Sequence, residues 1–195
     1  MTIVEKTYKI KSFDEFTKEE QEKILEKYRD INIYDDLTNM DEVFYLDIDN
    51  AGFKSPKIYY DLSCCQGSGA SFECDEIDFR ELIKEFDCKH KAWLLSYLEQ
   101  YCIGRVISNR YSNHYCHERT REVNFDNYCN YEYKRIEKLV NEFFDYVEHK
   151  RYKLSCELYK NLSNYYDELQ SDENVKDCLL ANEYLFNENT LEIEN

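Results

Sequence analysis

Apolar and polar residues follow recognisable periods along much of this chain. Residues 4–10 (VEKTYKI) largely alternate between polar and apolar, which predicts a β-strand. Thr17 and Glu20 then form the pattern of a capping box, and the apolar residues after them recur every three or four positions. We therefore expect a helix over residues 17–29, and a weaker helical pattern continues over residues 35–46.

The middle of the chain predicts short elements. Short helices are expected over residues 79–86 and 90–100, where apolar residues return at helical spacing. Short alternating runs rich in β-branched and aromatic residues predict strands. These runs are residues 57–62, 70–74, 103–110 and 115–125.

The C-terminal part predicts long helices. Apolar residues recur at helical spacing over residues 133–147 and again over 154–169, and Ser171 is placed to cap one last helix. No internal repeat and no linker divides the chain. The pattern therefore predicts one domain over residues 1–195, of the α+β class, with a small antiparallel sheet packed against long C-terminal helices.

Composition narrows the class of protein. Apolar residues make up 43% of the 195 residues and charged residues 34%, with one proline, so a folded core is expected. No apolar leader and no run of about 18 apolar residues occurs, so we expect a soluble, cytoplasmic protein without a membrane segment. The nine cysteines are dispersed and form no C-x-x-C pair, which is typical of reduced thiols and offers no metal or cofactor site.

Negative charge is concentrated in two segments. The net charge is −16, with seven acidic residues and no Lys or Arg in residues 30–50, and nine acidic residues against Lys176 alone in residues 167–195. The balance reverses over residues 89–121. Such a charge disfavours direct binding to nucleic acid or to anionic membranes, and it permits binding to a basic protein surface. The alternative explanation of the negative charge is that it only keeps the protein soluble.

A glycine-containing loop separates two of the predicted strands. Residues 63–69 include Gly67 and Gly69, two of the four glycines of the chain. Glycine permits positive φ and close approach of another group, so the loop fits a hairpin turn, an anion-binding nest or a protein-contact loop. It is not a P-loop, because the Lys-Ser/Thr pair and a following long helix are missing.

A second polar cluster lies at His114, Tyr115, His117 and Glu118. On a strand, His114 and Cys116 would share one face, which makes a thiol–imidazole dyad conceivable. No oxyanion-binding arrangement accompanies this pair, and the structural alternative is a hydrogen-bonded histidine in a sheet. We therefore predict no catalytic residue.

Several motifs together resemble a known family. Four motifs follow one another along the chain in the same order as in that family. They are residues 13–32 (FDEFTKEEQEKILEKYRDIN), the loop in residues 60–72, Tyr115-Cys116-His117-Glu118 and the pattern over residues 162–186. They resemble small phage and prophage proteins, many of which are labelled as antitoxins of toxin–antitoxin systems. The resemblance implies a protein of a phage or another mobile element in a bacterial cytoplasm. It does not imply a known activity. Ser68 replaces the aspartate usual in the family's loop, which favours a structural role for that loop.

These observations favour an acidic interaction protein rather than an enzyme. We expect it to bind and inhibit a host protein with a basic surface, such as a component of a nucleic-acid-directed defence system, as an anti-CRISPR protein does. The alternatives are an antitoxin-like partner of a toxin, and a ligand-binding protein or enzyme that uses the glycine loop with His117 and Glu118. We expect binding through the acidic segments of residues 30–49 and 167–194, with the glycine loop as a further contact. The predicted partner-binding residues are Asp35, Asp36, Asp41 and Glu42, and, in the loop, Gln66, Gly67, Ser68, Gly69 and Ser71.

Overall fold

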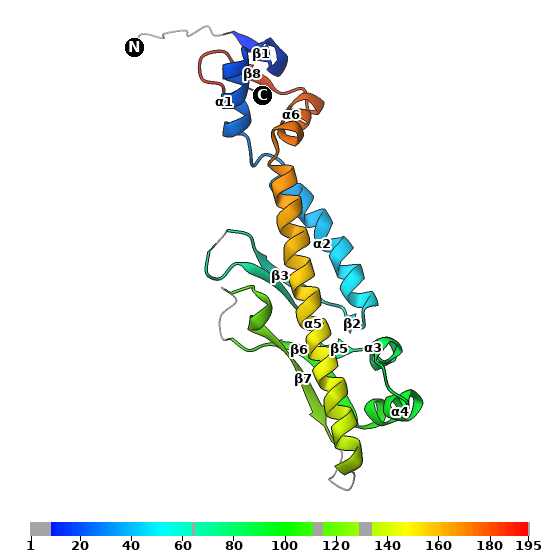
Figure 1. Ribbon diagram of the computed structural model, residues 1–195. Coiled ribbons are helices and arrows are strands. Elements are labelled where there is room, and N and C mark those ends of the chain that lie inside the picture. Colours follow the sequence, from blue (N-terminus) through cyan, green and yellow to red (C-terminus); the bar gives the residue numbers. More distant parts are fainter. Residues whose placement is uncertain (1–8, 64, 111–114, 129–133, 195) are drawn as a thin grey trace, which may run out of the picture. The chain divides into compact units, whose positions relative to one another are not determined.

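The structure is a computed structural model that describes residues 9–63, 65–110, 115–128 and 134–194, with the backbone alone for 34–41 and 134–136. The chain falls into two compact units. The smaller unit comprises Met1–Thr38 and Asn164–Asn195, and the larger unit comprises Asn39–Ser163. Two helices, α2 (Ile33–Asn50) and α5 (Lys134–Leu169), have residues in both units (Figure 1). The expectation of a single domain stays a prediction.

The smaller unit joins the two ends of the chain. Its three short strands pair antiparallel in the order β1-β8-β9, and α1 and α6 contribute to the same apolar core. Thr17 accepts a hydrogen bond from the Glu20 amide at the start of α1, and Ser171 caps α6 in the same way, as the sequence predicted. The elements are β1 (Ile10–Ser12), η1 (Phe13–Glu15), α1 (Lys18–Lys27), α6 (Asp172–Ala181), β8 (Leu185–Asn187) and β9 (Ile193–Glu194).

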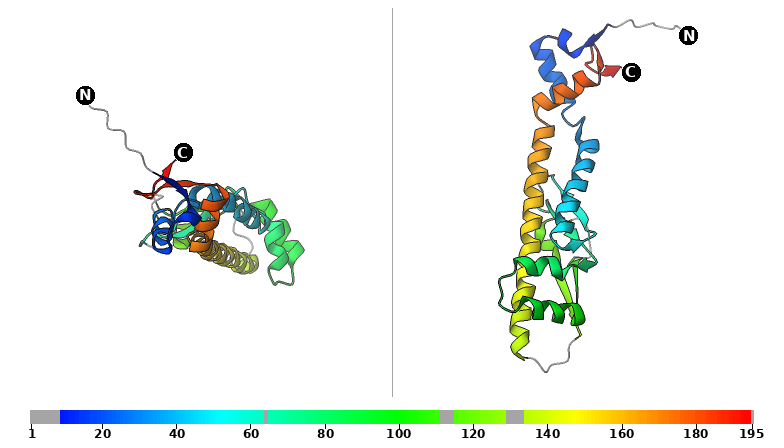
Figure 2. Two further views of the ribbon diagram at one scale, coloured as in Figure 1. Left: turned by 90° about the horizontal axis from the view of Figure 1, so that it is seen from above. Right: turned by 90° about the vertical axis from the view of Figure 1, so that its right-hand side faces the viewer.

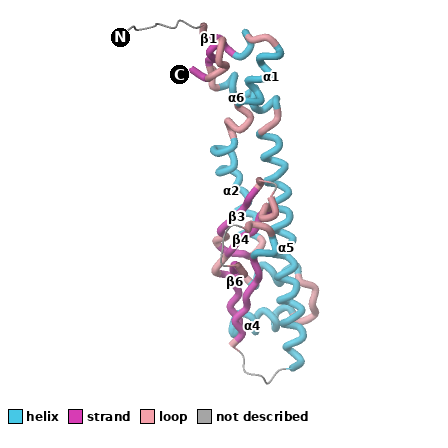
Figure 3. Tube along the Cα trace, turned by 90° about the vertical axis from the view of Figure 1, so that its left-hand side faces the viewer, coloured by secondary structure: helices cyan, strands magenta, loops and turns pink. Residues whose placement is uncertain are grey.

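The larger unit contains three two-stranded antiparallel ladders, β2-β5, β3-β4 and β6-β7, which Figure 3 shows in magenta. A single bridge between Cys74 and Val106 links the β3-β4 hairpin to β6. Two short helices, α3 and α4, lie between β5 and β6 in the sequence (Figure 2, right). The elements are β2 (Phe53–Lys54), β3 (Lys57–Asp61), β4 (Gly69–Glu73), β5 (Glu76–Ile77), α3 (Phe79–Glu85), α4 (Lys91–Tyr101), β6 (Cys102–Ser108), η2 (Glu118–Thr120) and β7 (Arg121–Asn127).

The long helix α5 closes the core of the larger unit. Val140, Phe143 and Val147 are buried along one face of α5 at helical spacing. The Phe144 ring stacks on Phe125 of β7 with 3.8 Å between ring centroids. The two apolar stripes predicted for the C-terminal part therefore lie on one continuous helix of 36 residues. None of the described helices combines the length and the apolar character needed to cross a membrane.

The α+β class is confirmed, with three differences in detail. Among the described residues the expected single sheet is divided into four small sheets, and β1 pairs with β8 rather than with the central strands. The strand expected over residues 115–125 is wrong in its first half, where His117 caps the 3-10 helix η2 and β7 starts only at Arg121. Of the strand expected over residues 4–10, only Ile10 lies in β1, and residues 4–8 lie outside the described residues.

Candidate functional site

The glycine loop (residues 63–69, of which the structure describes 63 and 65–69) contains a turn that its own side chains stabilise. The Ser63 amide and hydroxyl both donate to Asp61 Oδ1, at 2.8 and 2.5 Å. Ser68 Oγ accepts a hydrogen bond of 2.7 Å from the Cys65 amide, and the Ser68 amide donates to the Cys65 carbonyl oxygen. The serine at this position therefore supports a tight turn through bonds of its hydroxyl group and its amide with the Cys65 backbone.

Gly69 brings the glycine loop against the segment that contains His117. A Cβ atom added to Gly69 would lie 2.4 Å from His117 Cα, and the φ angle of +153° is one that other residues rarely adopt. Close by, the Cys116 amide donates a hydrogen bond of 3.1 Å to the Gly67 carbonyl oxygen. The two polar clusters that stood apart in the sequence thus form one site, and the expected close approach at a glycine is confirmed.

A buried arginine lies beside this contact. One face of the β3-β4 hairpin contains every second residue of β4, namely Gly69, Ser71 and Glu73. Tyr59 of β3 pairs with Ser71 and lies on the same face. Arg121 covers this face: its Nε atom lies 2.7 Å from Glu73 Oε1, and its guanidinium group lies 4.5 Å from the centroid of the Tyr59 ring. The Arg121 side chain is fully buried.

Arg121 was not among the residues predicted from the sequence, although the strand pattern contained a sign of it. Arg121 occupies an inward-facing position of β7, on the same face of the strand as the half-buried residues Val123 and Phe125. A charged residue at such a position requires a partner charge, so the pattern could have directed attention to it.

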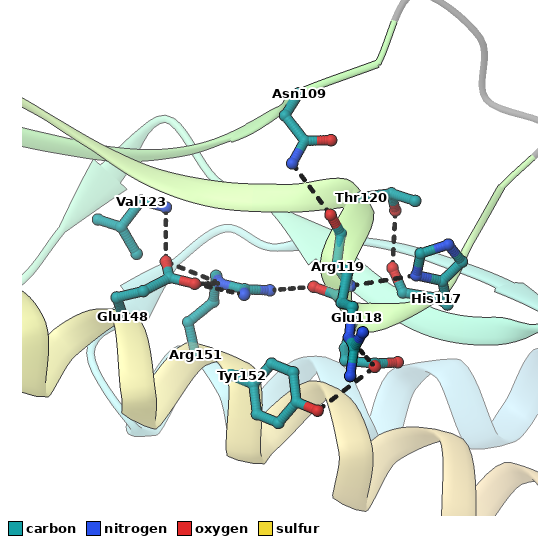
Figure 4. Close-up of polar contacts among 9 residues, drawn as sticks. All are labelled: Asn109, His117, Glu118, Arg119, Thr120, Val123, Glu148, Arg151 and Tyr152. Carbon is teal, nitrogen blue, oxygen red and sulfur yellow. Dashed lines mark hydrogen bonds and ion pairs between the residues drawn. The ribbon is translucent and has the colours of Figure 1, made fainter.

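Contacts with α5 fix the turn that contains His117 and Glu118 (Figure 4). His117 Nδ1 accepts a hydrogen bond from the Arg119 amide, at 3.3 Å, and the His117 carbonyl oxygen accepts one of 2.7 Å from Thr120. From α5, Arg151 Nη1 donates to the Glu118 carbonyl oxygen at 2.8 Å, and the Tyr152 hydroxyl donates to Glu118 Oε1 at 3.4 Å.

The same region of α5 satisfies an amide of β7. Glu148 Oε2 accepts a hydrogen bond of 2.8 Å from the Val123 amide, and the Glu148 carboxylate also pairs with the buried Arg151 side chain. His117 and Glu118 are therefore engaged in contacts that stabilise the fold. On the described residues, these contacts favour the structural alternative over an acid–base pair. His114 lies outside the described residues, so the structure does not test the alternative of a dyad between His114 and Cys116.

Two thiols of the site differ in chemical character. The neighbouring hydroxyl groups of Ser63 and Ser68 lower the pKa of the exposed Cys65 thiol. Burial raises the pKa of the Cys116 thiol. Cys65 is thus the more readily ionised of the two, and it is open to reagents in water.

Only part of the glycine loop is accessible to a partner. Gln66 is exposed and Ser68 is half-buried, whereas Gly67, Gly69 and Ser71 are buried. The burial of these three residues does not fit direct contact with a partner, because the loop would first have to open. Gln66 and Ser68 are the loop residues that stay available for the predicted role.

The exposed part of α2 offers a larger surface. Val43 and Leu46, one helical turn apart, are 52% and 59% exposed, and Tyr45 on the adjoining side is also exposed. We call Val43, Tyr45 and Leu46 the α2 patch. Glu42 and Asp47 are exposed beside it, and no described Lys or Arg pairs with either. The side chains of Asp35, Asp36 and Asp41, which the sequence predicted as partner-binding residues, lie outside the described residues.

One protein family matches most of the chain. The sequence pattern of a domain of unknown function, DUF8835, matches residues 13–172. The chain belongs to the DUF8835 family. Comparison with curated proteins found no match, and comparison with solved structures found none either.

The DUF8835 match includes every surface described above. It covers α2, the glycine loop, the His117 turn and all of α5, and it ends at the first residue of α6. Strands β8 and β9 lie beyond it. The DUF8835 region therefore contains the α2 patch and the glycine loop, whereas part of the core of the smaller unit comes from residues after the match.

Proposed function

We propose that this protein binds a basic surface of a host protein through the α2 patch and the acidic residues around it. The observation that supports this proposal is the exposure of Val43, Tyr45 and Leu46 between Glu42 and Asp47. Large apolar side chains inside an acidic surround match the usual anatomy of an interface, in which an apolar centre supplies affinity and a charged rim supplies orientation.

The distribution of charge supports a basic partner. The stretch of residues 30–50, which includes all of α2, has seven acidic residues and no Lys or Arg. Among these acids, Asp49 is neutralised by Lys54, whose Nζ atom lies 3.1 Å from Asp49 Oδ2. Glu42 and Asp47 are exposed and pair with no described Lys or Arg, and such surface charges attract a basic partner over a distance of about one Debye length, roughly 8–10 Å at physiological salt.

The class of partner that fits best is a nucleic-acid-binding protein, because its binding groove is basic and accepts an acidic surface in place of phosphates. With the resemblance to phage proteins, this leads to the proposal of a phage-encoded inhibitor of a host defence system, acting in the bacterial cytoplasm. The protein would act by binding rather than by catalysis, since His117 and Glu118 are held in contacts of the fold.

Affinity capture from a bacterial lysate, read by mass spectrometry, tests the role of the α2 patch. We expect a basic protein to be retained by the wild-type chain and lost with the double change Val43→Ser/Leu46→Ser. The matched control is Leu180→Ser/Leu185→Ser, which alters two exposed leucines of the smaller unit and should retain the partner. Retention by the α2 variant, or loss with both variants, would contradict the proposal. Capture of a toxin in place of a defence protein would favour the antitoxin-like alternative.

A further inference from the structure

A groove of about 640 Å³ opens on the larger unit, where β5 passes into α3 and lies beside α4 and β6. Its volume falls in the range of roughly 300–1,000 Å³ that is common for ligand sites. Four of its lining residues are acidic, and Arg80 is the one basic residue among them. The acidic residues are Asp75, Glu76, Asp78 and Glu99.

Two of these acids already have partners in the protein. Arg80 Nη2 lies 2.5 Å from Glu99 Oε1, so these two charges neutralise each other. Asp78 caps α3, and its Oδ1 atom accepts a hydrogen bond of 2.9 Å from the Arg80 amide. Both contacts hold the walls of the groove in place.

Asp75 and Glu76 remain exposed at the groove, and no described Lys or Arg pairs with either of them. Lys54 lies opposite Glu76 in the β2-β5 ladder, but its ammonium group is bound to Asp49 instead. The groove therefore has two carboxylates, from residues that are neighbours in the sequence, which pair with no Lys or Arg in the described part of the chain.

An apolar surface lies beside these carboxylates. Ile103 of β6 is 48% exposed at the groove, with the buried side chains of Ile77 and Phe79 also in the lining. The next basic residue on the same face of β6, Arg105, forms an ion pair with Asp126 and so does not neutralise the groove.

We infer that this groove binds an arginine side chain of a basic protein partner. The methylene stem of an arginine would cover Ile103, and its planar guanidinium would bind the carboxylates of Asp75 and Glu76. An arginine side chain combines an apolar stem with a weakly hydrated charged end, and these two parts match the apolar floor and the acidic edge of the groove. The inference deepens the proposed function, on which its biological role rests, by assigning a second contact with the same kind of partner.

Binding is measured with the full chain and N-acetyl-arginine amide, followed by NMR of isoleucine methyl groups. We expect saturable shifts of the Ile77 and Ile103 methyl resonances and unchanged resonances of Ile24, which is buried in the smaller unit. N-acetyl-citrulline amide, which has nearly the same shape without the charge, should produce no saturable shift. Equal shifts with both compounds, or none with the arginine compound, would overturn the inference.

A charge-matched pair of variants tests the role of the two carboxylates. Asp75→Asn/Glu76→Gln should weaken binding of the arginine compound about tenfold, the effect expected when two surface ion pairs are lost. Glu173→Gln/Asp177→Asn removes the same charge from exposed positions of α6 and should leave binding unchanged. An equal loss with both variants would show that only the overall charge matters and would overturn the site.

The capture experiment separates this inference from the proposed function. If Asp75→Asn/Glu76→Gln loses the arginine compound but still retains the partner through α2, the groove binds arginine without serving that interface. If neither compound binds while the α2 variant still loses the partner, the groove inference fails and the proposed function stands.

Discussion

Gly69 lies in a position that no other residue can occupy without movement of backbone atoms. A Cβ atom at Gly69 would lie 2.4 Å from His117 Cα and 3.0 Å from the His117 amide nitrogen. We predict that Gly69→Ala lowers the free energy of unfolding by about 1–3 kcal/mol, as overpacking usually does, measured by urea denaturation. Gly104→Ala is the comparison, because its nearest neighbours would be side-chain atoms of Ile77 and Phe125 at 3.0 Å rather than backbone atoms at 2.4 Å, and it should cost less. An equal loss for both changes would contradict this explanation of the glycine loop.

Cys65 is the thiol whose reactivity follows most directly from its surroundings. Hydroxyl groups of Ser63 and Ser68 lower the pKa of Cys65, and the thiolate is the nucleophilic form. We predict that iodoacetamide modifies Cys65 before the other described cysteines. The midpoint of its rate–pH profile should lie below that of an ordinary exposed cysteine, because ionisation at lower pH supplies thiolate earlier. In Ser63→Ala/Ser68→Ala the midpoint should rise, and an unchanged profile would exclude the proposed cause.

The β3-β4 hairpin and β7 are joined by the pair of Glu73 and Arg121. Arg121 is fully buried, so Glu73→Gln would leave its charge without a partner. We predict a loss of about 2–3 kcal/mol in the free energy of unfolding, less than the 3–5 typical of a fully buried pair, because Glu73 remains partly in contact with water. Glu122→Gln, an exposed neighbour on β7, should have little effect.

A double-mutant cycle tests whether these two residues are coupled. If Arg121→Met is added to Glu73→Gln, the combined loss should be smaller than the sum of the single losses by at least about 0.5 kcal/mol. Additive losses would show that Arg121 and Glu73 act independently and that the hairpin is held against β7 by other contacts.

Elements with local determinants could be predicted from the sequence. The helices α1 and α6 were predicted because Thr17 and Ser171 signal their starts within a few residues, and β3 and β4 because alternation and a glycine loop lie close together. The turn at His117 was mistaken for a strand, because its shape depends on contacts with Gly69 and with Arg151 of α5, which are distant in the sequence.

Other features had no local pattern to reveal them. Strands β8 and β9 contain three and two residues, too few for any period to show. The approach of the glycine loop to His117 connects residues almost 50 positions apart, and only the tertiary fold brings them together. For the same reason the sequence suggested loop residues as partner contacts without showing that Ser71 is fully buried.

At the scale of the whole molecule, charge is distributed unequally between the two units. The smaller unit has 19 Asp and Glu against 8 Lys and Arg, a net −11, and the larger unit has 22 against 17, a net −5. Charge alone would therefore favour the smaller unit as the surface that attracts a partner. The α2 patch is proposed as the contact because it combines exposed apolar side chains with acids, whereas the remaining charge contributes to attraction over distance.

The association rate of the captured partner, measured over a series of salt concentrations, tests the central claim most directly. Added salt shortens the Debye length from about 10 Å at 0.1 M to about 3 Å at 1 M, so an association steered by charge must slow. We predict that Asp35→Asn/Asp36→Asn/Asp41→Asn/Glu42→Gln slows association at low salt and flattens its dependence on salt. The control Asp167→Asn/Glu168→Gln/Glu173→Gln/Asp177→Asn, which removes the same charge from α5 and α6, should retain most of the rate. An α2 variant with the wild-type rate and salt dependence would contradict the account.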